Sequence, residues 1–137
     1  MGIAKIWIYG ESTDGSVATT TLELLAKARQ LADTVDVVVH GDASVLAAEL
    51  GEHGAASVLS IGDLGDGLPG PRIASAIAGA VAAGSGPSVV LCGTTYGGRD
   101  VAGRLSVKLD APVITNVVDL IPDGERLLGV EPVFGGT

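Results

Sequence analysis

The sequence predicts an α/β domain in which a mostly parallel sheet lies between two layers of helices. Strand-like apolar runs alternate four times with segments of helical periodicity, between residue 3 and residue 109. Two further strand-like runs follow, joined by the turn pair Asp123-Gly124, which is typical of a hairpin. Together these observations indicate a Rossmann-like three-layer sandwich with an antiparallel edge hairpin.

Composition limits the classes of function. With 137 residues, 47% of them hydrophobic, the chain is long enough for a single domain with a real core. A net charge of −8 argues against nucleic acid and against an anionic membrane surface as partners. The apolar runs fall short of the roughly 20 residues that a membrane span needs, and no signal peptide is visible. The lone Cys92 excludes an internal disulfide and is typical of a reducing compartment, so we expect a cytoplasmic protein.

The elements can be taken in order along the chain. The expected strands are rich in β-branched and aromatic residues, and they cover residues 3–9, 35–40, 57–61, 89–92, 113–121 and 127–134. The expected helices carry an apolar face of helical period, and they cover residues 17–33, 43–52, 73–84 and a segment that ends at Leu109. Ser16 is the expected cap of the first helix, and Pro71 lies in the first turn of the third.

The third helix has an unusual outer face. No residue from Ile73 to Gly98 carries a formal charge, whereas a solvated helix normally presents charges to water. Two interpretations remain open: another domain or subunit covers this face, or it is an alanine-rich surface exposed to solvent.

The most informative stretch connects the fourth strand to the fourth helix, and it reads Leu91-Cys-Gly-Thr-Thr-Tyr-Gly-Gly-Arg-Asp-Val-Ala-Gly-Arg-Leu105. A strand, a glycine-rich turn and a helix N-terminus aim backbone N–H groups and a positive dipole end at whatever lies in front. Arg99 opposes that dipole, so either a ligand or a carboxylate answers its charge, or its side chain points into water.

Topology places a crevice next to this turn. Ligands of such sheets bind where the strand order reverses, which here is between the first and fourth strands. The candidate residues, for a nucleotide-like ligand or a partner contact, are Gly10, Glu11, Gly93, Thr94, Thr95, Gly97, Gly98, Arg99, Asp100 and Arg104.

Other motifs do not assemble a site. The Gly-x-Gly-x-x-Gly spacing of residues 65–70 follows a third strand, and its neighbouring aspartates would repel a pyrophosphate. His40, His53 and Cys92 lack metal-ligand spacing, so no metal is expected. No nucleophile elbow occurs and nothing pairs two carboxylates, so no catalytic residue is expected.

Four segments carry a family resemblance over essentially the whole chain. They are Thr20-Thr-Leu-Glu-Leu-Leu-Ala-Lys-Ala-Arg29, Gly93-Thr-Thr-Tyr-Gly-Gly-Arg-Asp-Val-Ala-Gly-Arg-Leu105, Ala111-Pro-Val-Ile-Thr-Asn-Val-Val-Asp119 and Pro132-Val-Phe-Gly-Gly136. In order and spacing they resemble the alpha subunits of electron transfer flavoproteins. The second segment is close to that family's Gly-Arg-Asp-x-Ala-x-Arg-Leu signature.

The resemblance implies a heterodimeric electron carrier of the bacterial cytoplasm, which takes electrons from flavin dehydrogenases to an acceptor. It implies that residues 1–137 form the N-terminal domain of the alpha subunit, with a fold similar to adenine nucleotide alpha hydrolase-like domains. That family's FAD is held mostly by a C-terminal domain, so an end at Thr137 implies a truncated chain with no flavin of its own. The implied role is a scaffold that docks the beta subunit, without catalysis. Arg99, Asp100 and Arg104 would lie at that contact or brace the turn.

Two other functions can be compared with this one. A small AMP- or ATP-binding module of the universal stress protein type would share the fold, and the turn at residues 93–99 presents N–H groups to a phosphate. The glycine pattern usual in that module is absent from the chain. A hydrolase or ligase of the same fold lacks an assembled catalytic set. An unfinished sheet also leaves backbone groups open, and the sequence leaves open whether the chain self-associates through that edge.

Overall fold

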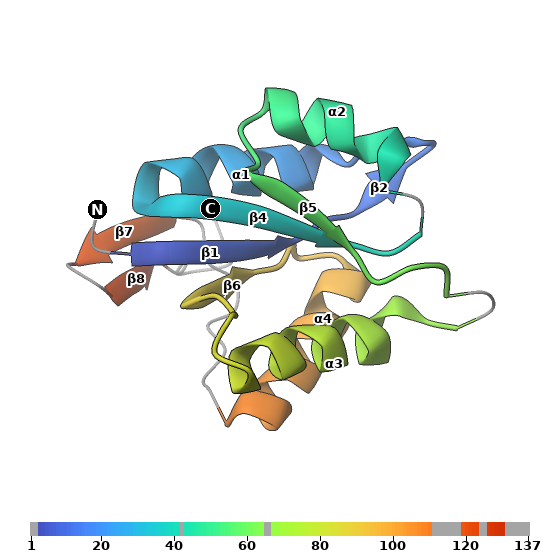
Figure 1. The fold of residues 1–137 in the computed structure, drawn as a ribbon. Coiled ribbons are helices and arrows are strands. Elements are labelled where there is room, and N and C mark those ends of the chain that lie inside the picture. Colours follow the sequence, from blue (N-terminus) through green and yellow to red (C-terminus); the bar gives the residue numbers. More distant parts are fainter. Residues whose placement is uncertain (1–2, 42, 65–66, 111–118, 124–125, 131–137) are drawn as a thin grey trace, which may run out of the picture.

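Apolar side chains on both faces of the central strands bury the sheet between two layers of helices (Figure 1). The computed structural model describes residues 3–41, 43–64, 67–110, 119–123 and 126–130. Its parallel sheet contains β1 (Ile3–Tyr9), β4 (Ala32–Val39), β5 (Ser57–Ser60) and β6 (Val89–Leu91). Its helices are α1 (Thr19–Leu31), α2 (Ser44–Glu52), α3 (Pro69–Ala82) and α4 (Tyr96–Leu109). The fold class predicted from the sequence is confirmed.

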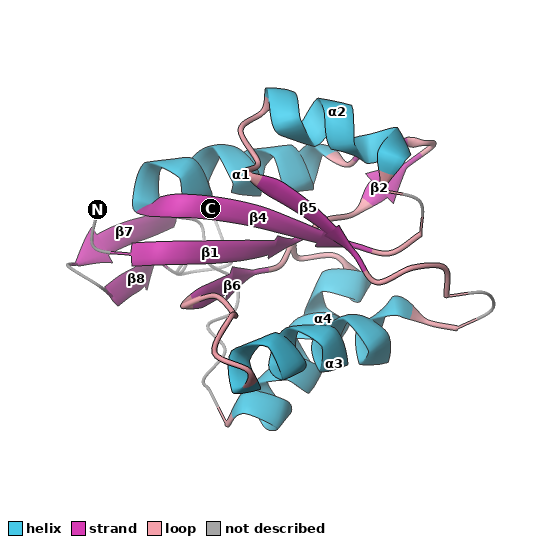
Figure 2. Cartoon of the chain, viewed as in Figure 1, coloured by secondary structure: helices cyan, strands magenta, loops and turns pink. Residues whose placement is uncertain are grey.

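The order of the strands is β5-β4-β1-β6. The chain therefore builds the sheet in one direction from β1 to β5 and then returns to the other side of β1 with β6. Helices α1 and α2 cover one face, and α3 and α4 cover the other (Figure 2). Because the order reverses between β1 and β6, the place where the sequence predicts a crevice is at the carboxyl ends of these two strands.

Each face of the sheet has its own core. On the α1 and α2 side, aliphatic residues pack together, and the fully buried members include Ile6, Ile8, Leu25 and Leu50. On the α3 and α4 side, the cluster contains Trp7, Tyr9, Val38, Ile73, Ala74, Ile77, Val101 and Leu105. Consecutive residues of β1 therefore enter opposite cores, which is the alternation expected of a strand covered on both faces.

A short hairpin precedes α1 and changes its start. Strands β2 (Ser12–Thr13) and β3 (Ser16–Val17) pair antiparallel around Asp14 and Gly15, whose φ angles are 52° and 80°. The helix therefore begins at Thr19, and its N-cap is Ala18, whose methyl side chain cannot accept a capping hydrogen bond. The predicted capping role of Ser16 is wrong, because Ser16 is paired in the hairpin.

Other boundaries differ by a few residues. Helix α1 ends at Leu31 and the chain enters β4 directly, so residues 32–33 are strand rather than helix. Helix α3 begins at Pro69, and Pro71 lies in its first turn as predicted. After α2, Gly54 has a φ of 101°, a conformation that favours glycine and ends the helix.

The C-terminal hairpin is antiparallel, as predicted. Strands β7 (Asp119–Asp123) and β8 (Arg126–Val130) pair with Asp123 opposite Arg126. Within the described residues these two strands form a sheet of their own. The predicted strands were longer, and their remaining residues, 113–118 and 131–134, lie outside the described part of the chain.

Candidate functional site

The turn between β6 and α4 is tight because glycines pack against other parts of the chain. A Cβ on Gly98 would overlap the carbonyl of Gly93. A Cβ on Gly93 would lie 2.8 Å from Cγ2 of Thr20 in α1. Thr95 caps the helix, since its Oγ1 accepts a hydrogen bond from the N–H of Gly98 at 2.9 Å. Gly93 and Gly98 thus serve the packing of the protein against itself.

Glu11 brings a carboxylate to the same turn from the end of β1. The hydroxyl of Thr95 donates to this carboxylate, with distances of 2.8 Å to Oε1 and 3.0 Å to Oε2. Gly97, in the first turn of α4, borders it as well, because a Cβ there would lie 3.2 Å from Oε2. A negative charge beside a helix N-terminus is favourable. The positive end of α4 therefore faces a carboxylate of the same chain.

The backbone around Glu11 is held independently of its side chain. The N–H of Glu11 donates to Oγ1 of the buried Thr21 at 3.0 Å, and its carbonyl accepts from the N–H of Ala18 at 2.9 Å. The preceding Gly10 donates to the carbonyl of Val38 at 2.8 Å, and a Cβ on Gly10 would press against valine side chains of β4. These contacts direct the Glu11 side chain towards α4.

Two weak acids lie near this carboxylate, the buried Tyr9 and the partly buried Cys92. Burial, and then the negative charge of Glu11, raise the pKa of Tyr9 to about 12, and Cys92 and Asp100 add to the rise. Burial, followed by Glu11, raises the pKa of the Cys92 thiol to about 12. Both groups therefore stay protonated at neutral pH, where neither is a base and the thiol is not activated as a nucleophile.

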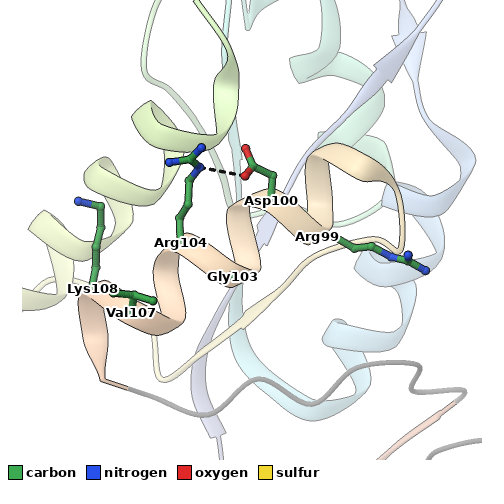
Figure 3. A pocket seen from close by; sticks show the side chains of 6 residues that line it. All are labelled: Arg99, Asp100, Gly103, Arg104, Val107 and Lys108. Atoms are coloured by element: carbon green, nitrogen blue, oxygen red, sulfur yellow. Dashed lines mark hydrogen bonds and ion pairs between the residues drawn. The ribbon is translucent and has the colours of Figure 1, made fainter.

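Asp100 and Arg104 form a second group on α4 (Figure 3). The Nε of Arg104 donates to Oδ1 of Asp100 at 2.9 Å, an i,i+4 ion pair. The pair packs on the first turn of α3, since a Cβ on Gly70 would overlap the Asp100 carboxylate and approach Nε of Arg104 to 3.3 Å. The sequence analysis expected these residues to meet a partner or brace the turn. In the structure they brace α4 against α3.

The outer side of α4 carries an open depression of about 490 Å³ (Figure 3). Its lining residues are Arg99, Asp100, Gly103, Arg104, Val107 and Lys108. Arg99 points away from the Asp100–Arg104 pair (Figure 3). Val107 is 84% exposed and Tyr96, at the start of the helix, is 94% exposed. We call Tyr96, Arg99, Gly103 and Val107 the α4 outer face, and Lys108 lies beside it, four residues after Arg104.

The structure divides the predicted site residues into two groups. The crevice group is Glu11, Gly93, Thr95, Gly97 and Gly98, with Gly10 buried behind it and Thr94 exposed in the turn. The helix group is Arg99, Asp100 and Arg104. Sequence reasoning missed the apolar members of the α4 outer face, Tyr96 and Val107. Their separation of eleven positions, close to three helical turns, is the signal that could have found them.

Within the described ranges, no three His, Cys, Asp or Glu residues gather as a metal site would require. In that same part of the chain, no helix is long and apolar enough to span a bilayer.

These observations define a Rossmann-like α/β domain in which the start of α4 faces one of the chain's own carboxylates, and α4 exposes two apolar side chains near basic ones. A family model described as "Electron transfer flavoprotein domain" matches residues 6–137, and the chain belongs to this family.

Curated relatives agree with this assignment. The electron transfer flavoprotein subunit alpha of Mycobacterium tuberculosis strain H37Rv is 31% identical over 137 residues, which cover 98% of this chain and 42% of the relative. The subunit of the same name from Syntrophomonas wolfei is 33% identical, with 98% and 43% covered. Protein FixB of Clostridium saccharobutylicum is 28% identical, with 96% and 41% covered. The chain therefore spans about two fifths of the length of these relatives.

Proposed function

We propose that this chain is the N-terminal domain of an electron transfer flavoprotein alpha subunit and that it acts as a docking scaffold for the beta subunit. In this proposal the whole protein carries electrons from flavin dehydrogenases to an acceptor, and this domain has no catalysis of its own. The identity with alpha subunits over about two fifths of their length supports the proposal.

The observation that carries the docking role is the α4 outer face. Two large apolar side chains, Tyr96 and Val107, are 94% and 84% exposed on one helix. Gly103 lies between them with nothing within 4 Å of a Cβ built there, so another chain can approach the helix backbone closely. Exposed aromatic and apolar residues ringed by charged ones are typical of protein interfaces.

The charge of this face indicates the chemistry of the partner surface. The depression on α4 is lined by three basic residues, Arg99, Arg104 and Lys108, and by one acidic residue, Asp100, in a chain whose net charge is −8. The face is thus a local positive area on an acidic protein. Complementary charge guides association and selects partners, so the surface that docks here should carry carboxylates around an apolar centre.

The crevice does not fit the pyrophosphate of FAD. The Glu11 carboxylate accepts the Thr95 hydroxyl at 2.8 Å beside the helix end that a phosphate would use. We therefore place the flavin of the whole protein on residues outside this crevice. The same carboxylate argues against the alternative of an AMP- or ATP-binding module.

Size-exclusion chromatography tests the docking role. The purified chain would be mixed with the beta subunit from the same organism, and we expect the two to elute together. Val107→Asp should weaken the complex about tenfold or more, because it buries a charge at the contact. The control is Val45→Asp, the same change at a 62% exposed valine on α2, on the opposite side of the sheet.

Two results would contradict the proposal. One is a folded chain, judged by circular dichroism, that does not elute with the beta subunit. The other is equal weakening by Val107→Asp and Val45→Asp, which would separate docking from the α4 outer face.

A further inference from the structure

We infer that the partner docks on α4 through a helix of its own, which packs over Gly103 and carries carboxylates on both sides of one large apolar residue. The inference rests on the proposed docking function and adds to it the kind of element and the side chains that the beta subunit would bring. Exposed apolar side chains by themselves do not specify these, because a loop or a strand can also cover them.

The shape of the depression on α4 favours a helical partner. Its described lining residues all belong to α4, and they form two neighbouring rows in which each residue is four positions from the next (Figure 3). One row is Arg99, Gly103 and Val107, and the other is Asp100, Arg104 and Lys108. Rows of this spacing are the ridges of a helix surface, and the groove between two ridges receives a ridge of another helix. A strand, with its two-residue period, has no ridge of matching spacing.

Gly103 determines where the partner helix crosses. Nothing lies within 4 Å of a Cβ built on Gly103, whereas the side chain of Val107, one turn later, is 84% exposed. The row therefore has a gap between Arg99 and Val107. Because the distance between packed helices depends on the side chains at the contact, this gap lets a second helix approach closely. One large apolar side chain of the partner then fits over Gly103, against Val107 and the aliphatic stem of Arg99.

The charges beside the groove indicate the polar residues of the partner helix. Arg104 is paired with Asp100 at 2.9 Å, so these two charges cancel. Within the part of the chain that the structure describes, no hydrogen bond or ion pair engages the side chain of Arg99 or of Lys108. These two cations lie at opposite ends of the groove, about 14 Å apart along the helix axis. Carboxylates on both sides of the central apolar residue of the partner complement them.

Isothermal titration calorimetry of the chain with the beta subunit from the same organism tests the crossing at Gly103. Gly103→Leu fills the gap and should weaken binding about tenfold or more, and Gly103→Ala should weaken it about threefold. The alanine should also raise the melting temperature by about 2–4 °C, because it favours the helix and meets no other atom closely. A variant that is more stable and binds less tightly excludes loss of folding as the cause.

Gly51→Leu and Gly51→Ala are the matched controls. Gly51 lies in α2, on the opposite side of the sheet, and also has nothing within 4 Å of a Cβ (Figure 2). Both variants should bind the beta subunit as wild type does. If wild type does not bind the beta subunit, the proposed function fails and the inference fails with it. If wild type binds and Gly103→Leu binds as tightly as Gly51→Leu, docking stands and the inference alone is overturned.

Photo-crosslinking identifies the element that docks. p-Benzoylphenylalanine at position 96 keeps an aromatic ring at the exposed start of α4, and mass spectrometry then locates the crosslinked residues of the beta subunit. We expect residues three or four positions apart in one segment, with Asp or Glu within a turn of them, as on the face of a helix. Crosslinks to residues two positions apart would indicate a strand. That result, or a crosslinked segment without carboxylates, would overturn the inference.

Discussion

The two helical layers differ most on the sides that face away from the sheet. On one side, α1 exposes polar residues such as Glu23, Arg29 and Gln30, as a helix in contact with water normally does. On the other side, α3 exposes Ala76, Gly79 and Ala82 and places no charge on its surface after Arg72. The sequence analysis left two readings of that uncharged face open. The neighbouring α4 outer face supports the reading in which a partner covers this layer.

The inner sides of the layers are more alike. Leu25 of α1 and Ile77 of α3 are both 0% exposed, so each layer has a closed core against the sheet. The difference is the polar content near β1, because the α3 and α4 side includes Trp7, Tyr9 and the buried carboxylate of Asp36. The packing against the sheet therefore does not distinguish the α1 and α2 layer from the α3 and α4 layer. The outer surface of the helices makes that distinction.

The largest expected loss of stability comes from shortening a core side chain, and the same change in each layer tests whether the two cores are equivalent. Leu25→Ala and Ile77→Ala should each lower the free energy of unfolding by about 2–5 kcal/mol, because each leaves a cavity in a closed core. Urea unfolding followed by circular dichroism measures both. A cost for Ile77→Ala far below that for Leu25→Ala would mean that the α3 and α4 layer is loosely packed, and the comparison would fail.

The next effect concerns the contact between α3 and α4. Gly70→Ala should cost about 1–3 kcal/mol, because the new methyl group overlaps the Asp100 carboxylate and displaces the ion pair with Arg104. Gly79→Ala is the control in the same helix, where nothing lies within 4 Å of the added carbon. That change should stabilise the protein by about 0.5–1 kcal/mol through helix propensity. Thermal melts of the two variants should therefore shift in opposite directions.

A similar or slightly smaller loss of stability is expected when the hydrogen bond between Trp7 and Asp36, beneath α3 and α4, is removed. Nε1 of Trp7 donates to Oδ2 of Asp36 at 3.1 Å, and Asp36 is only 7% exposed. Trp7→Phe should cost about 1–3 kcal/mol, because the carboxylate loses a donor that water does not easily replace. Adding Asp36→Leu should recover part of the loss. Unfolding must be followed by circular dichroism, since Trp7 is the only tryptophan. Equal stability of the single and double variants would argue against the hydrogen bond as the cause.

The smallest expected effect on the free energy of unfolding at neutral pH comes from the weak acids Tyr9 and Cys92. The pKa of Cys92 rises from 9.0 to about 12 on folding, and that of Tyr9 rises from 10.0 to about 12. The unfolded chain therefore ionises before the folded one, so stability is full below pH about 9 and falls as the pH rises towards about 12. Cys92→Ala should make this decline shallower. Urea unfolding between pH about 7 and about 10.5 measures it, and an unchanged slope would contradict the assignment.

Much of the fold could be predicted because it depends on local periodicity. The four alternating strands and helices and the hairpin around Asp123 follow from which residues are apolar and at what spacing. The reversal of strand order beside β1 was predicted from the usual topology of that fold class. The β2–β3 hairpin was missed because its strands have two residues each, too few to show alternation. As a result, α1 was placed two residues early. The pair Asp14-Gly15 was the available signal.

The sequence predicted where the candidate residues lie, but not which of them contact each other. Topology placed Glu11 and Thr95 at one edge of the sheet, and nothing in the sequence said that they would bond to each other. Likewise, Asp100 and Arg104 have the spacing of an ion pair, but their contact with Gly70 depends on how α3 packs against α4. Such contacts join residues far apart in the chain, and periodicity within a segment carries no information about them.

By itself, the sequence determined the class of fold, the order of its elements and the acidic, single-cysteine character of the chain, because these depend on composition and on spacing along the backbone. Only the tertiary structure decided that the Glu11 carboxylate bonds to Thr95 at the start of α4, and that Tyr96 and Val107 of α4 are left exposed. The physical reason is that a side chain's partner depends on which distant segments come within a few ångströms, and the packing of the whole chain sets those distances.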